Sequence, residues 1–147
     1  MPDGGITTLF SVMMTTSRGY LTFTGSTATW VFETAKKLEA LGRLQPGWDS
    51  YNGHSLSAGS RDLTLNVLGW LGSDELPTPA VVLGSEGNVH LEWKTKGREL
   101  EIELGDDEHM SFVKVYPNGF IEEGEEPANL PVKLRGLTLW LMYGREP

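Results

Sequence analysis

Hydrophobic residues recur along the chain with two different periods, and the change of period divides the sequence. Between about residues 27 and 73 they follow the spacing of amphipathic helices, and beyond residue 79 they alternate with polar residues as in half-buried strands. The helical spacing predicts one helix over residues 27–42, with Ser26 as its N-cap and Gly42 at its end. It predicts a second helix that begins after the N-cap Ser57 and closes at Gly72-Ser73.

The alternating region predicts an antiparallel hairpin with one apolar and one charged face. Lys96-Gly97 has the composition of a two-residue turn, because glycine adopts a positive φ without steric cost. This turn fixes the register of the flanking strands, residues 89–94 and 99–104. The core side then carries the pairs Trp93–Leu100, Leu91–Ile102 and Val89–Leu104. The solvent side carries Lys94–Glu99, His90–Glu103 and the like-charge pair Glu92–Glu101, which costs roughly a few tenths of a kcal/mol and is typical of a binding surface.

Further strands flank this hairpin on both sides. Residues 80–83 precede it, and residues 110–116 follow after an acidic turn. Asn118-Gly119 is the strongest hairpin signal in the chain. We expect the chain to return through residues 120–121 into an acidic loop over residues 122–126.

The two ends of the chain carry weaker patterns. Residues 8–15 and 20–24 are rich in strand-forming residues and predict two strands joined by a turn, with residues 1–5 loose. Near the other end, Asn129 as a cap and Pro131 in the first turn favour a helix over residues 129–143, although part of this segment also alternates as a strand would. The whole chain, residues 1–147, is predicted to be one α+β domain. Its antiparallel meander has about four strands, with two or three helices packed on one face.

Charge and cysteine content narrow the classes of function. The chain has 20 acidic and 12 basic residues, a net charge of −8, which argues against binding to nucleic acid or an anionic membrane because both need clustered Lys and Arg. The absence of Cys excludes disulfides, thiolate catalysis and Cys-ligated metals. No apolar run is long enough for a transmembrane helix or a clear signal sequence. We therefore expect a cytoplasmic protein of a bacterium or of a phage-infected host.

Sequence patterns that carry enzyme chemistry are missing. No nucleophile elbow and no phosphate-binding glycine loop occurs, and three widely separated histidines show no metal-binding spacing: His54, His90 and His109. On the predicted hairpin, His90 and Glu92 lie opposite Glu101 and Glu103, and these side chains can supply nitrogen and oxygen ligands to a metal ion. A solvated, salt-bridged face is the simpler interpretation. We predict no catalytic residue, no bound metal and no cofactor.

The loop between the two predicted helices contains the most distinctive segment, Gly47 to Gly53, with two large aromatic residues among turn formers. Two interpretations are open. In the first, Trp48 and Tyr51 fill the gap between the helices and the sheet edge, while the Asp49 carboxylate accepts hydrogen bonds from nearby backbone amides. In the second, four residues form a ligand-binding patch: Trp48, Asp49, Tyr51 and His54.

Gly47-Trp48-Asp49 with Tyr51, followed by Leu91-Glu92-Trp93, resembles a poorly characterised family of small bacterial and phage proteins. Members of this family carry a Gly-Trp-Asp-x-Tyr loop, a following helix and a strand that ends in Leu-Glu-Trp. The resemblance spans residues 38–104, and the chain departs from it at Asn52-Gly53-His54, where the family has Gly-Ala and a small residue. It implies a compact intracellular domain, often encoded on mobile elements, and transfers no catalytic residues.

These observations favour a non-catalytic acidic protein that docks on the basic surface of a toxin, nuclease or effector, as an antitoxin, immunity protein or phage-encoded inhibitor. The predicted contact residues are Glu92, Glu99, Glu101, Glu103, Asp106, Asp107 and Glu108. An alternative is a sugar- or nucleoside-binding module, or a weak hydrolase, that uses the Trp48–His54 loop. A third is a subunit that oligomerises through the open sheet face or through the strand at residues 20–23.

Overall fold

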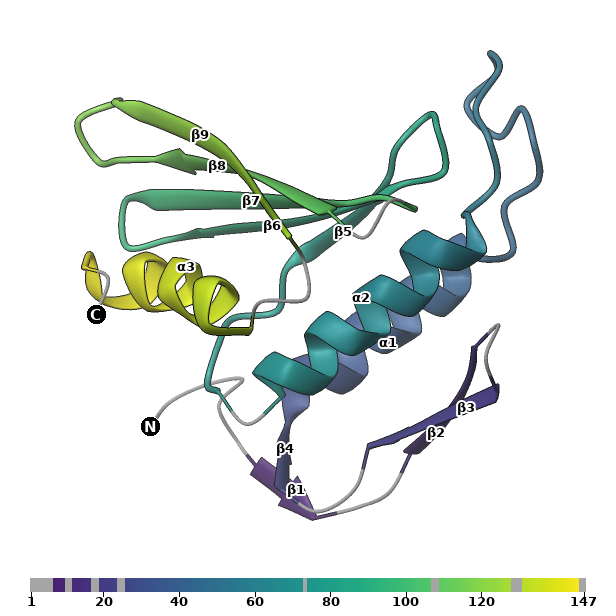
Figure 1. The fold of residues 1–147 in the computed structure, drawn as a ribbon, viewed down its shortest axis with the longest axis horizontal. Coiled ribbons are helices and arrows are strands. Elements are labelled where there is room, and N and C mark those ends of the chain that lie inside the picture. The colour runs from purple at the N-terminus through teal and green to yellow at the C-terminus, as the bar shows by residue number, and fades with distance from the viewer. Residues whose placement is uncertain are drawn as a thin grey trace.

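A five-stranded antiparallel sheet packs with one face on three helices in the computed structural model (Figure 1). The structure describes residues 7–9, 12–16, 19–23, 26–72, 74–106, 109–127 and 131–145. The sheet strands follow chain order: β5 (Ala80–Leu83), β6 (Val89–Thr95), β7 (Arg98–Leu104), β8 (His109–Val115) and β9 (Ile121–Pro127). The helices are α1 (Thr29–Leu41), α2 (Ala58–Leu71) and α3 (Pro131–Tyr143). The predicted α+β fold is confirmed, with one strand more than expected.

The N-terminal segment forms two small antiparallel sheets, separate from the main one. One pairs β1 (Thr7–Leu9) with β4 (Ser26–Ala28), and the other pairs β2 (Val12–Thr16) with β3 (Gly19–Phe23). Figure 1 shows the β2–β3 hairpin on the side of α1 and α2 that faces away from the main sheet. The strand expected over residues 20–24 is present as β3, whereas the one expected over residues 8–15 corresponds to two strands, β1 and β2, in different sheets. The predicted turn at residues 17–19 lies partly outside the described residues.

Two of the three predicted helix starts are confirmed. The Ser57 hydroxyl caps α2 by accepting a hydrogen bond from the Ser60 amide at 3.1 Å. The helix α3 has Pro131 in its first turn as predicted, and its predicted cap, Asn129, lies outside the described residues. Ser26 does not cap α1. It lies in β4, where it pairs with Leu9, and Ala28 occupies the N-cap without a side-chain hydrogen bond. Strand pairing takes the place of a side-chain cap in leading the chain into α1.

The central hairpin has the predicted register along its whole length. β6 and β7 pair Trp93 with Leu100 and Glu92 with Glu101, as the two-residue turn requires. Lys96 and Gly97 both adopt positive φ, 55° and 77°, which matches the twist of the strands they join. The alternation then buries one face, so that Leu91 and Ile102 are fully buried on the helix side.

Residues 122–126 form part of β9 and are not the predicted acidic loop. They pair with β8 throughout, from Glu122 opposite Lys114 to Glu126 opposite Met110. On the inner side of this edge strand, Gly124 lies against the ring of Phe112, so close that an added Cβ would lie 2.6 Å from the ring Cζ. The inner side of β9 is thus filled by a neighbour's aromatic ring, which explains why the strand shows no apolar alternation of its own.

The hydrophobic core lies between the inner face of the sheet and the helices. Trp30 of α1 and Trp93 of β6 meet edge to face with ring centroids 6.2 Å apart. Their indole N–H groups donate to the Asp74 and Pro77 carbonyl oxygens, both at 2.8 Å. The two tryptophans therefore attach the connector between α2 and β5 to the core. Within the described residues, no helix combines the length and the apolar character needed to cross a bilayer.

One inner-face position of β8 carries a charge. Lys114 is 3% exposed, and its Nζ lies 3.6 Å from Glu122 Oε1 and 4.8 Å from the centre of the Trp140 ring. The Tyr116 hydroxyl donates to the same Glu122 oxygen at 2.7 Å. This hydrogen bond lowers the pKa of Glu122, with the Lys114 charge acting in the same direction, and raises the pKa of Tyr116. The cluster fastens the edge strand β9 to the core.

Candidate functional site

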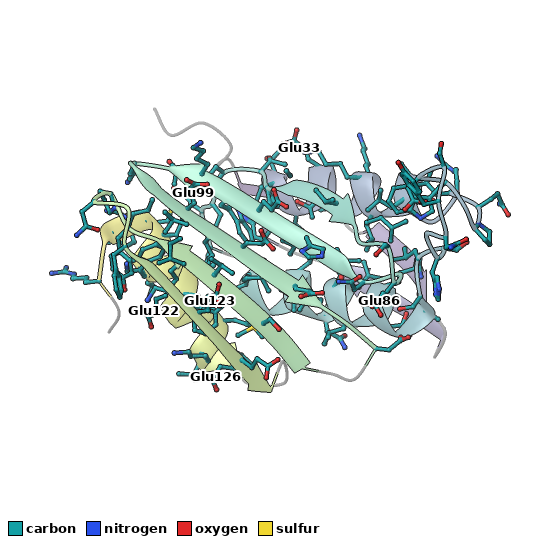
Figure 2. All side chains as sticks on the ribbon, turned by 90° about the horizontal axis from the view of Figure 1, so that it is seen from above. Glu33, Glu86, Glu99, Glu122, Glu123 and Glu126 are labelled. Carbon is teal, nitrogen blue, oxygen red and sulfur yellow. The ribbon has the colours of Figure 1, made fainter. Side chains whose placement is uncertain are left out.

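The face of the sheet that points away from the helices is the candidate functional site (Figure 2). We call it the open sheet face and define it by the strand residues whose side chains alternate outward. On β6 and β7 these are His90, Glu92, Lys94, Glu99, Glu101 and Glu103. On β8 and β9 they are Ser111, Val113, Val115, Ile121, Glu123 and Glu125.

Negative charge dominates the open sheet face. Six of these twelve residues are glutamates, and only Lys94 and His90 carry or can carry positive charge. Glu92 and Glu101 lie directly opposite each other across β6 and β7, as the sequence predicts. Like charges at opposed positions destabilise a sheet, so this arrangement costs stability in the free protein.

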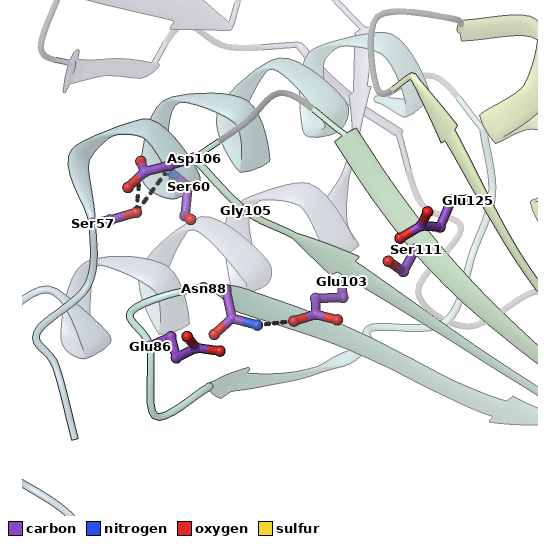
Figure 3. Close-up of a pocket in the computed structure, with 9 residues that line it drawn as sticks. All are labelled: Ser57, Ser60, Glu86, Asn88, Glu103, Gly105, Asp106, Ser111 and Glu125. Carbon is purple, nitrogen blue, oxygen red and sulfur yellow. Dashed lines mark hydrogen bonds between the residues drawn. The ribbon is translucent and has the colours of Figure 1, made fainter. Parts of the chain in front are cut away.

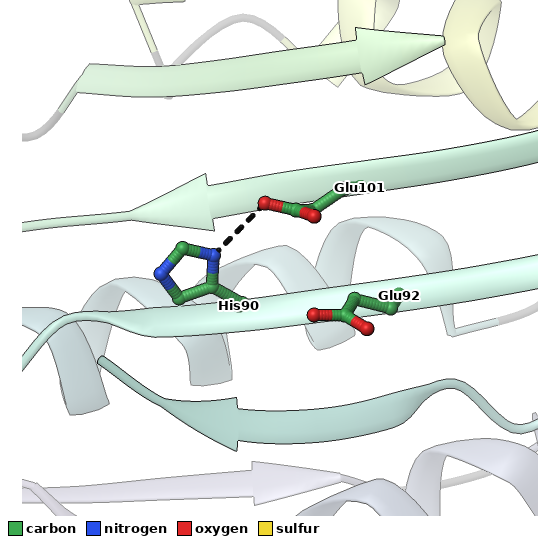
Figure 4. Close-up of side chains that lie close together, drawn as sticks. All are labelled: His90, Glu92 and Glu101. Atoms are coloured by element: carbon green, nitrogen blue, oxygen red, sulfur yellow. Dashed lines mark hydrogen bonds and ion pairs between the residues drawn. The ribbon is translucent and has the colours of Figure 1, made fainter. Parts of the chain in front are cut away.

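A small polar cluster surrounds His90 on this face (Figure 4). His90 Nδ1 lies 3.1 Å from Glu101 Oε1, and Nε2 lies 3.7 Å from Glu103 Oε2. The Asn88 amide donates to the same Glu103 oxygen. One ligand atom each from His90, Glu92 and Glu101 lie within 4.8 Å of one another, so these three residues could together hold a metal ion. The same ion pairs and hydrogen bond are also those of an ordinary solvated charged face, which needs no metal ion.

The structure describes five of the seven predicted contact residues and places them at two locations. Glu92, Glu99, Glu101 and Glu103 lie together on the open sheet face. Asp106 follows β7 and turns to α2, where its Oδ1 accepts a hydrogen bond from the Ser57 hydroxyl at 2.9 Å. The other two, Asp107 and Glu108, lie outside the described residues.

Two acidic residues of the open sheet face were missed by the sequence analysis. Glu123 and Glu125 point outward from β9 beside Val113 and Ser111. The sequence pattern predicts a loop at these positions because the inner positions of β9 are not apolar. The Asn118-Gly119 turn was the available signal, since a tight turn at this point requires the chain to run back along β8.

The Gly47–Gly53 segment folds on itself. Asp49 Oδ1 accepts hydrogen bonds from the Tyr51 and Gly53 amides, both at 3.0 Å, as the first interpretation predicts. The Trp48 indole donates to the His54 carbonyl oxygen at 2.7 Å. The expectation that Tyr51 fills the gap between the helices and the sheet edge is wrong, because its side chain is 83% exposed. Trp48 is half-buried, and its indole bonds within the loop.

A shallow hollow of about 590 Å³ lies against this loop, and Tyr51 and His54 are among its lining residues. The Asp49 carboxylate is engaged by the loop amides, and the imidazole of His54 is exposed. The acid–base pair that a weak hydrolase would need from Asp49 and His54 therefore has no support in this geometry. The loop is best described as a self-contained turn that presents one tyrosine to solvent.

The fold and the site together define an α+β protein with helices on one face of its sheet and an acidic open face on the other. Comparison of the chain with models of known protein families, with curated proteins and with solved structures finds no match.

Proposed function

We propose that this protein is a non-catalytic binding protein whose open sheet face docks on a basic surface of another protein. The observation that carries the proposal is the set of six glutamates that project from β6, β7 and β9 on one face of the sheet. Charge complementarity of this kind steers diffusional encounter and excludes acidic partners.

Two features of the open sheet face support a protein as the occupant. The opposed Glu92 and Glu101 repel each other in the free protein, and a cationic side chain between them would relieve this repulsion. Exposed apolar side chains lie at both edges of the sheet, Val82 on β5 and Ile121 on β9. An acidic face that extends over several strands, with an exposed apolar side chain on each edge strand, suits a folded partner better than a small molecule.

The partners that present a strongly basic surface include nucleases and toxins that act on nucleic acid, because such proteins must neutralise phosphates. We therefore propose the role of an antitoxin, immunity protein or phage-encoded inhibitor, acting in the cytoplasm of a bacterial host. In this role the open sheet face would occupy the surface that otherwise receives the nucleic acid.

The test compares two double variants of equal net charge. Glu92→Gln/Glu101→Gln removes two charges from the open sheet face, and Glu39→Gln/Glu75→Gln removes two exposed charges elsewhere. The wild-type chain is used to capture proteins from nuclease-treated bacterial lysate at low salt, and the main captured protein is identified and purified. Its Kd for each variant is then measured by calorimetry at several salt concentrations.

We expect a basic captured protein whose Kd rises at least tenfold, about 1.4 kcal/mol, with the face variant and changes less than twofold with the control. The dependence of log Kd on salt should also be weaker for the face variant. Equal losses for both variants, a Kd that ignores salt, or retention of no basic protein would contradict the proposal.

A further inference from the structure

A pocket of about 300 Å³ opens at one end of the open sheet face, next to the N-terminus of α2 (Figure 3). Four carboxylates line it, and of the described residues that line it none is basic: Glu86, Glu103, Asp106 and Glu125. Three serine hydroxyls also line it, from α2 and β8. Its size is at the lower end of ligand-binding pockets, which suits one side chain better than a large ligand.

The pocket is assembled from elements far apart in the sequence. Glu103, Ser111 and Glu125 lie side by side across β7, β8 and β9 because they occupy matching register positions. Ser57 and Ser60 enter from the first turn of α2. The pocket is therefore continuous with the acidic surface of the proposed function.

Ser60 gives the clearest sign that this pocket takes a ligand. The residue is 1% exposed, and its Oγ is buried without a hydrogen-bond partner among the described residues. Both backbone groups of Ser60 are hydrogen-bonded: the amide donates to Ser57 Oγ, and the carbonyl oxygen accepts from Thr64 Oγ1. A buried hydroxyl without a partner is uncommon in native proteins, and here it lines an acidic pocket.

The sign of the charge in the pocket selects a cation. A helix N-terminus by itself favours an anion, but Asp106 already supplies one and accepts a hydrogen bond from the Ser57 cap. The remaining carboxylates, Glu86, Glu103 and Glu125, leave the pocket negative. Its ligand should therefore carry positive charge and several N–H donors.

We propose that the pocket receives the guanidinium group of an arginine side chain on the basic partner, an inference that rests on the proposed function. A guanidinium has five N–H donors in a planar fork and can reach acceptors that lie on different sides of a pocket, whereas an ammonium is a compact point charge. The acceptors that line the pocket for such a group are the carboxylates of Glu86, Glu103 and Glu125, together with the hydroxyl of Ser60.

The test uses three short peptides that differ at one position, acetyl-Gly-X-Gly-amide with X as arginine, lysine or citrulline. Citrulline keeps the shape of arginine and lacks its charge. Each peptide is titrated into the isotope-labelled full chain, and amide resonances are followed by NMR. We expect saturable shifts at Ser60, Glu103 and Ser111 with the arginine peptide, at least threefold weaker binding of the lysine peptide, and at least tenfold weaker binding of the citrulline peptide.

Variants separate the pocket from the rest of the open sheet face. Ser60→Ala should weaken binding of the arginine peptide at least threefold. Glu125→Gln should weaken it as well, and because Glu125 is exposed this substitution does not disturb folding. Glu99→Gln removes a charge from the face outside the pocket and should weaken the peptide affinity less than Glu125→Gln does.

Equal affinity for the arginine and citrulline peptides would overturn the pocket inference, as would equal effects of Glu125→Gln and Glu99→Gln. Tighter saturable binding of Mg²⁺ or Ca²⁺ at the same amides would also overturn it, in favour of a metal site. These results would leave docking by Glu92 and Glu101 intact. Conversely, specific arginine-peptide binding without any basic partner would contradict the proposed function and support the pocket.

Discussion

Trp30→Ala is expected to lower the free energy of unfolding by about 3–5 kcal/mol, a large share of the total stability of a small domain. The Trp30 side chain is 0% exposed and packs edge to face on Trp93. Its indole N–H also holds the Asp74 carbonyl, which lies in the connector that leads from α2 to β5. The substitution thus removes a large buried surface and leaves a carbonyl without its donor. Urea unfolding followed by circular dichroism measures the loss.

Trp48→Ala provides the matched control. This tryptophan lies in the loop before α2, and its indole N–H donates to the His54 carbonyl in the same loop. We expect it to cost about 1 kcal/mol, close to the value of a single hydrogen bond. If Trp30→Ala leaves the chain too unstable to measure, Trp30→Phe should still cost more than Trp48→Ala. Equal losses of unfolding free energy at the two positions would contradict the central place of Trp30 in the core.

Glu122→Gln is expected to lower the free energy of unfolding at neutral pH by about 1–2 kcal/mol. The substitution keeps an oxygen to accept the Tyr116 hydrogen bond but removes the charge that faces the buried Lys114 ammonium. Hydrogen bonds and ion pairs of a charged group are worth up to about 3 kcal/mol, and the partial exposure of Glu122 reduces this value.

The effect of Glu122→Gln should depend on pH. The Tyr116 hydroxyl and the Lys114 charge hold the pKa of Glu122 below its ordinary value of 4.5. The stabilisation is therefore complete above pH 4.5 and is lost as the pH falls through the lower pKa of the folded state. We expect the difference between wild type and variant to shrink on the acid side of 4.5.

Glu123→Gln is the control for this experiment, because it removes the same charge from the outer side of the same strand. It should change the unfolding free energy by less than about 0.5 kcal/mol. A difference between wild type and Glu122→Gln that stays constant from neutral to acid pH would contradict the role given to the Lys114 cluster.

The sequence determined the central part of the fold because local signals there agree. Strict alternation on both sides of Lys96-Gly97 allowed one register, and that register is observed. The pattern failed where long-range contacts replace local ones. β9 is held by the Phe112 ring over Gly124 and by the Lys114–Glu122 contact, and α1 starts where β4 ends its pairing with β1.

The candidate site could be predicted only in part for the same reason. Four contact glutamates followed from the hairpin register, whereas Glu123 and Glu125 depended on recognising β9 as a strand. The pocket was not predictable from local pattern, because it requires the start of α2 to meet the far end of the sheet. Ser57 bonds Asp106 across 49 positions of sequence, and its amide bonds the Gly87 carbonyl.

The most direct test of the central claim is thiol labelling on this cysteine-free chain. Three single variants are compared: Glu101→Cys on the open sheet face, Ile102→Cys on the buried face, and Glu39→Cys at an exposed position of α1. Without the partner, Glu101→Cys and Glu39→Cys should react rapidly with a maleimide. Ile102→Cys should react at least 100-fold more slowly, because the protein must open locally before the buried thiol is exposed to the reagent. The purified basic partner should then slow labelling of Glu101→Cys at least tenfold and leave Glu39→Cys unchanged. Faster labelling of Ile102→Cys than of Glu101→Cys, or protection of Glu39→Cys instead of Glu101→Cys, would contradict the account.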